Sequence, residues 1–110
     1  MTPVIASART MFDALAVEMR GEGVSVGMAF GHRALKHSGL GVACLEHETM
    51  VFRLPASTPE HAEALAVDGA HTWAPSTLNA ALPDWVVVPF SSSARWLPWA
   101  RVAVRNNSAA

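Results

Sequence analysis

The chain has few of the residues on which many recognisable functions depend. It contains one cysteine, no tyrosine and only 15% charged residues among its 110 positions. The single cysteine, Cys44, excludes an internal disulfide, and its place in an apolar stretch predicts a small buried side chain in a reducing compartment. We therefore expect a cytoplasmic protein.

Long apolar runs are also missing. No stretch approaches the roughly 18 apolar residues that a membrane-spanning helix needs, and the N-terminus lacks the basic region and apolar block of a secretory signal. The net charge of −1 argues against strong non-specific binding of nucleic acid. The remaining composition, with 51% hydrophobic residues, predicts one globular domain over residues 1–110.

No catalytic, metal-binding or nucleotide-binding motif is recognisable. The Gly-x-Ser-x-Gly elbow of many hydrolases and the glycine-rich phosphate loop are both absent. The histidines show neither an i,i+4 pair on a helix nor the ordered spacing of a zinc site; they are His32, His37, His47, His61 and His71. We predict a protein that is not an enzyme and has no metal or cofactor.

Residues 24–54 carry the clearest pattern, an alternation of apolar and small or polar side chains. This period of two predicts strands at 24–30, 39–45 and 49–54. In the first strand the side expected to face the core is formed by Val24, Val26, Met28 and Phe30. The connection at 46–48 is so short that the last two strands must be antiparallel.

The second face of these strands is unusually small. It is formed by Ser25, Gly27, Ala29, Gly41 and Ala43. Glycine weakens a strand and often marks a close approach of another group. Two interpretations remain open: a shallow face in contact with solvent, or a face on which a second subunit or a ligand packs.

The flanking segments predict three helices and two further strands. A hydroxyl residue followed by proline marks helix starts at Thr2-Pro3 and Thr58-Pro59, which predicts helices over 3–20 and 59–68. Short strands are expected at 70–75 and 84–89. Ser91 to Ser93 are expected to cap a last helix that is either kinked at Pro98 or divided into two pieces with Pro98 at the first position of the second. The fold class is therefore α+β in two layers, an antiparallel five-stranded sheet covered by helices, in the order α-β-β-β-α-β-β-α.

Two groups of residues are candidates for binding a ligand or partner. The segment 31–38, read as a polar loop between two strands, carries His32, Arg33 and Lys36. Near the kinked last helix, Trp96 and Trp99 either line an exposed groove or belong to the core, and Arg101 lies close by in sequence. The simpler interpretation of the loop is a solvated connection.

Several segments together resemble one known family. They are Gly-Met-x-Phe-Gly at 27–31, Ala-Leu-Lys at 34–36, Phe-Arg-Leu-Pro at 52–55, Trp-Val-Val-Val-Pro at 85–89 and Trp-Leu-Pro-Trp-Ala at 96–100. In this order the chain, over about residues 10–105, resembles the TfoX N-terminal-domain family, relatives of the YjbR-like proteins. The resemblance implies a secretion-chaperone-like two-layer fold and a regulatory role, and it supplies no catalytic residues.

Three functions follow as hypotheses. The first is a small interaction or regulatory domain that binds protein and forms a homodimer. The second is a nucleic-acid-associated regulator, for example of transcription or competence, which requires that Arg33, Lys36, Arg95, Arg101 and Arg105 converge. The third is a small-ligand pocket between the last helix and the sheet, near His32 and Arg33.

Overall fold

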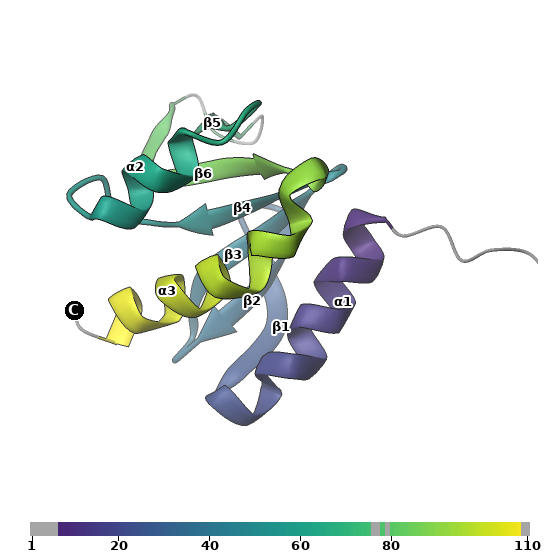
Figure 1. Cartoon of the computed structure of the whole chain (residues 1–110). Coiled ribbons are helices and arrows are strands. Elements are labelled where there is room, and N and C mark those ends of the chain that lie inside the picture. Colours follow the sequence, from purple (N-terminus) through teal and green to yellow (C-terminus); the bar gives the residue numbers. More distant parts are fainter. Residues whose placement is uncertain (1–6, 76–77, 79, 109–110) are drawn as a thin grey trace, which may run out of the picture.

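The chain folds into three α-helices and one six-stranded antiparallel sheet (Figure 1), as seen in a computed structural model that describes residues 7–75, 78 and 80–108. The elements follow in the order α1 (Ala8–Met19), β1 (Val24–Ala29), β2 (His32–His37), β3 (Leu40–Glu46), β4 (Thr49–Arg53), α2 (Pro59–Leu65), β5 (His71–Trp73), β6 (Leu82–Pro89) and α3 (Trp96–Ser108). Short 3-10 segments, Arg20–Glu22 and Phe90–Arg95, precede β1 and α3. The strands lie in the order β1-β2-β3-β4-β6-β5. The α+β class is confirmed. Within the described chain, no helix is long and apolar enough to span a bilayer.

The sixth strand, β2, occupies the segment that we read as a polar loop. Two-residue turns at Phe30-Gly31 and Ser38-Gly39 join it to its neighbours, with φ values of 54° and 80° in the first turn and 53° and 80° in the second. These values are typical of type I′ hairpin turns, which need positive φ at both central residues and for which Asn-Gly is the usual pair. The strand was missed because Phe and Ser are unusual at the first turn position, and because only Ala34 and Leu35 of β2 are fully buried.

The observed ends of α1 and α2 differ from the predicted helix ranges, whereas their starts are marked by capping side chains. Ser7 caps α1, since its side chain accepts a hydrogen bond from the Thr10 backbone N–H at 3.2 Å; α1 therefore begins at Ala8, and the Thr2-Pro3 signal lies outside the described residues. The cap at Thr58 is confirmed, but α2 ends at Leu65 rather than at residue 68.

The last helix is divided into two pieces, as one of the two alternatives predicted, but the second piece begins at Trp96 rather than at Pro98. The 3-10 segment Phe90–Arg95 contains the non-helical residue Ser92, and α3 begins after it at Trp96. Pro98 lies in the first turn of α3, where a missing N–H costs nothing. The predicted serine cap is wrong, because Pro89 occupies the N-cap position of the 3-10 segment and no side chain caps it.

All three helices pack on one face of the sheet. Figure 1 shows α1 and α3 crossing this face. The core between the layers includes Phe12, Leu15, Met19, Leu35, Met50, Phe52, Ala64, Val86, Val88, Trp96 and Trp99. Val26 and Met28, which we expected there, are instead 47% and 61% exposed. The reason is that β1 is an edge strand, and only its first residue, Val24, is buried beneath the helices.

A second cluster lies on the opposite face, so the small side chains there are covered by other side chains of the same chain. It contains Ala34, Cys44, Val51, Trp73, Trp85 and Val87, with Ala29, Phe30 and Leu82 at its margin. Phe30 follows β1 at one edge of the sheet, whereas Trp73 belongs to β5 at the other, and their ring centroids are 5.4 Å apart. The sheet therefore curls around this face, and the small side chains allow its strands to approach.

One irregularity shifts the pattern within β3. Leu35 of β2 pairs with Ala43, but Lys36 pairs with Gly41, so β3 carries one extra residue at Val42. Val42 and Ala43 consequently both belong to the helix-side core, while Cys44 lies on the concave face. The prediction that Ala43 shares the small face is wrong for this reason.

Candidate ligand-binding pocket

The sheet opens between β3 and β4, and a pocket occupies the opening. The two strands pair from Glu46↔Thr49 only as far as Ala43↔Phe52. Beyond that point β3 follows β2, while the Leu54 backbone N–H donates to the Asp84 carbonyl at 2.8 Å and holds β4 against β6. The resulting pocket has a volume of about 390 Å³ and is lined by Ala29, Phe30, Leu40, Gly41, Arg53, Trp85 and Asn107.

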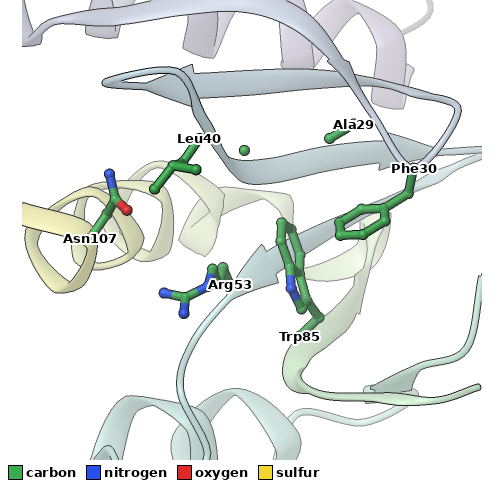
Figure 2. Close-up of a pocket in the computed structure, with 7 residues that line it drawn as sticks. Ala29, Phe30, Leu40, Arg53, Trp85 and Asn107 are labelled. Atoms are coloured by element: carbon green, nitrogen blue, oxygen red, sulfur yellow. The ribbon is translucent and has the colours of Figure 1, made fainter. Parts of the chain in front are cut away.

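Aromatic rings form one wall of the pocket. Phe30 and Trp85 meet edge to face, with centroids 5.5 Å apart and an interplanar angle of 88° (Figure 2). Trp73 stands behind them, 5.4 Å from Phe30 and 5.5 Å from Trp85. Three rings in mutual contact make a rigid apolar surface with little rotamer freedom left to lose on binding.

The backbone at Phe30 is strained. Its φ of 54° is rare for a bulky residue, and such a conformation costs on the order of 1–3 kcal/mol. The contacts of its ring with Trp73 and Trp85 offset that cost. Strain of this kind persists where the surrounding structure holds a side chain in one position. Here the strained backbone positions the Phe30 ring, which forms part of the pocket wall.

Gly41 keeps the pocket open on the β3 side. A Cβ atom at this position would lie 3.0 Å from the Ala29 Cβ and 3.9 Å from the Trp85 Cη2. The Ala29 contact is shorter than ordinary van der Waals separation, so a side chain at residue 41 would press on β1 and fill the space in front of the indole. This is the close approach that glycine in a strand signals.

Two polar groups face the aromatic wall. The Arg53 side chain is half-buried and, in the described part of the chain, makes no hydrogen bond or ion pair. The Asn107 amide nitrogen donates to the His37 carbonyl and to the His37 Nδ1, both at 3.1 Å, which holds the last turn of α3 against the β2–β3 turn. Figure 2 shows Arg53 extending from β4 on the side of the pocket nearer Asn107. The pocket thus offers one unpaired cation beside an apolar wall.

Cys44, beneath the aromatic cluster, is chemically inert. Burial, and secondarily the Glu46 carboxylate, raise the pKa of its thiol to about 12. A thiol is a nucleophile or metal ligand only as the thiolate. Among the residues that the structure describes, no three His, Cys, Asp or Glu side chains lie close enough together to hold a metal ion.

The candidates in β2 lie near the pocket but do not line it. His32 packs beside Trp73 with ring centroids 5.6 Å apart, and its Nε2 lies 3.8 Å from Glu46 Oε2. Arg33 is exposed at a position paired with Met28, whereas Lys36 projects from the opposite face of β2 and lies over Gly27. The structure therefore does not bring these three side chains together.

The candidates in the last helix serve the core and the surface. Trp96 and Trp99 are buried in the helix-side core, which favours the core interpretation over an exposed groove. The Arg95 guanidinium stacks 4.4 Å from the Trp99 ring centroid. Arg101 forms an ion pair with Glu22 at 3.0 Å and a longer one with Glu18 at 3.8 Å.

Sequence reasoning missed most of the lining residues. The small side chains at Ala29 and Gly41 left the packing of a ligand on this face as one of two open interpretations. Trp85 is buried at 6% exposure, and it still lines the pocket. Nothing local predicts that β3 and β4 separate after Ala43, so the pocket itself had no sequence signal.

Comparison with known protein families, with curated proteins and with solved structures found no match to this chain. The resemblance to the TfoX N-terminal-domain family stays a prediction that rests on the segments quoted for it. The functional argument depends on the geometry of the pocket.

Proposed function

We propose that this chain is a non-enzymatic domain that binds a small molecule with a planar apolar body and one anionic group, as in an aromatic carboxylate. The observation that supports this most directly is the unpaired, half-buried Arg53 beside the wall formed by Phe30 and Trp85. The pocket volume of about 390 Å³ lies within the range of small-molecule sites.

The charge of the ligand follows from Arg53. A guanidinium that is partly shielded from water and has no partner is energetically unfavourable. A carboxylate can pair with it by accepting two parallel hydrogen bonds. In the described part of the chain, no acidic side chain lines the pocket to compete for that role. The body of the ligand follows from the rings, because aromatic faces and edges favour a flat apolar group packed against them.

The lining also argues for binding without catalysis. Among the residues that the structure describes, the lining contains no histidine, carboxylate, hydroxyl or thiol, so it offers neither a nucleophile nor an acid–base pair that works near neutral pH. Binding and release are what this set of groups supports. The buried free thiol of Cys44 is consistent with the proposed cytoplasmic location.

The test is a titration with naphthalene-2-carboxylate and its neutral analogue naphthalene-2-carboxamide, followed by amide NMR shifts and tryptophan fluorescence. The carboxylate should bind at least about tenfold more tightly than the amide, with the largest shifts at Ala29, Gly41 and Trp85. The variant Arg53→Gln should abolish this preference, and the matched control Arg33→Gln, in an exposed residue of β2, should retain it. Absence of shifts at these residues at millimolar carboxylate, or equal losses in both variants, would reject the proposal.

The regulatory role that the family resemblance implies is compatible with this function, since a domain that binds a small molecule can report on its concentration. The nucleic-acid hypothesis gains no support from the cations. Arg101 is paired with Glu22, Arg95 stacks on Trp99, and the two basic residues of β2 point to opposite faces. That hypothesis needs a single convergent basic surface, and these four side chains give it no support.

A further inference from the structure

The outer edge of β1 is an unprotected sheet edge. In the described part of the chain β1 pairs with β2 alone, through a continuous register from Val24↔His37 to Ala29↔His32. Its sequence, VSVGMA, contains no charge and no proline, and its register shows no bulge. Natural proteins use lysine, proline or a bulge to block such an edge. None of these features is present in β1.

The hairpin geometry identifies which backbone groups point outward. A two-residue turn at Phe30-Gly31 makes Ala29 and His32 the closing hydrogen-bonded pair. Hydrogen-bonded and non-hydrogen-bonded pairs alternate along an antiparallel ladder. The N–H and C=O groups of Val24, Val26 and Met28 therefore point away from β2 and are open to another strand.

The exposed apolar side chains lie on the same residues. Val26 is 47% and Met28 61% exposed, and both project from the face on which the helices pack. They lie beyond the cover of the helices at the rim of the sheet. A strand added to β1 would satisfy the open backbone groups and cover both side chains at once.

We propose that the occupant of this edge is a second copy of the chain, paired antiparallel through β1 about a two-fold axis at Gly27. In that register Val26 lies opposite the partner's Met28, and Met28 lies opposite the partner's Val26. These are the residues whose backbone groups point outward, so each pair exchanges two hydrogen bonds. Because the strand is uncharged, the symmetry places no like charges against each other.

The other edge of the sheet disfavours a head-to-tail alternative. β5 has only three residues, and its register with β6 shifts between Thr72 and Trp73. The Thr72 carbonyl already accepts a hydrogen bond from His71 Nδ1 at 2.8 Å. A strand this short can form few hydrogen bonds with a β1 strand of another copy. Symmetric pairing of two β1 strands is therefore favoured, and it gives a closed dimer rather than a filament.

Crosslinking tests the register. Gly27→Cys places two thiols opposite each other on the axis. The nearest atom to the new Cβ is the Cδ of the flexible Lys36 side chain at 2.7 Å, which must move aside. The matched control Ser25→Cys lies two residues away on the same face, where the axis separates the two thiols by about 13 Å. Mild oxidation should give a reducible dimer for Gly27→Cys at least about tenfold faster than for Ser25→Cys. The native thiol does not interfere, because Cys44 is buried. Equal rates for the two variants would overturn the register.

Sedimentation tests the edge itself. The wild-type chain should sediment as a dimer at tens of micromolar, and Val26→Lys/Met28→Lys should dissociate at least about tenfold more readily because two lysines then face the partner. Val17→Lys, an equally exposed apolar position on α1, should dimerise as the wild type does. Circular dichroism checks that the variants stay folded. A wild-type monomer, or a dimer that the double-lysine variant leaves intact, would overturn the proposal.

Discussion

Phe30 and Trp73 come from opposite ends of the six-stranded sheet, yet their rings meet edge to face with centroids 5.4 Å apart and an interplanar angle of 87°. This contact draws the β1–β2 turn toward β5 and gives the sheet a concave face. Trp85 of β6 completes the group, 5.5 Å from each of the other two rings. The pocket and the curl of the sheet therefore have a common origin in three aromatic side chains.

The contact between the Phe30 and Trp73 rings is expected to contribute a measurable coupling energy to the stability of the fold. In a double-mutant cycle with Phe30→Leu and Trp73→Leu, the free energies of urea unfolding should depart from additivity by about 0.5–1.5 kcal/mol, the usual value of an aromatic pair. A control cycle of Phe30→Leu with Thr58→Ala, at the distant cap of α2, should be additive. Additivity in both cycles would mean that the ring contact does not hold the sheet edges together.

Glu46 stabilises the same aromatic cluster through a hydrogen bond. Its Oε2 accepts a hydrogen bond from the Trp73 indole Nε1 at 2.7 Å. Glu46→Ala should leave the buried indole N–H without a partner and lower the free energy of unfolding by about 1–3 kcal/mol. Glu46→Gln keeps a carbonyl acceptor and should lose less. The exposed Glu63→Ala, on α2, is the control and should stay within about 0.5 kcal/mol of wild type. Equal losses in the Ala and Gln variants would contradict the role of this hydrogen bond.

Gly41 is expected to control access to the pocket. Gly41→Ala should place a methyl group 3.0 Å from the Ala29 Cβ, destabilise the fold by about 1 kcal/mol and weaken binding of naphthalene-2-carboxylate several-fold. Ala29→Gly/Gly41→Ala removes the opposing methyl group and should recover most of the lost stability. Isothermal calorimetry and urea unfolding measure the two effects. Unchanged affinity in Gly41→Ala would show that the ligand does not enter between β3 and the Trp85 indole.

Because of Cys44, the free energy of unfolding is expected to decrease at alkaline pH. Burial, with a smaller effect of the Glu46 carboxylate, raises the pKa of the folded thiol to about 12 from the ordinary value of 9.0. Between these values the unfolded thiol has lost its proton and the folded thiol has kept it, so unfolding is favoured as the pH rises. The free energy of unfolding should fall by about 1.4 kcal/mol per pH unit in this window, and the full contribution is present below pH 9. Cys44→Ala should remove this part of the slope; an identical slope in the variant would refute the assignment.

Much of the fold could be predicted because it depends on local chemistry. Alternation within 24–54 located β1, β3 and β4 to within two residues, and Thr58-Pro59 marked the start of α2 as the structure has it. A strand was predicted at 84–89, and the observed β6 contributes Val86 and Val88 to one core and Trp85 and Val87 to the other. The strand β2 was missed because its turn residues and its polar side chains resemble those of an exposed loop.

The alternating pattern, the capping hydroxyls and the scarcity of reactive groups were determined by the sequence itself, because each arises within a few residues of backbone geometry. The tertiary structure alone decided that β1 lies at an edge, which leaves Val26 and Met28 exposed, and that β3 and β4 part after Ala43. A period of two shows that a strand has two faces, but what covers each face depends on which distant strands pair. The unpaired Arg53 and its aromatic wall come from that pairing: β4, β6 and the β1–β2 turn meet only when the sheet curls.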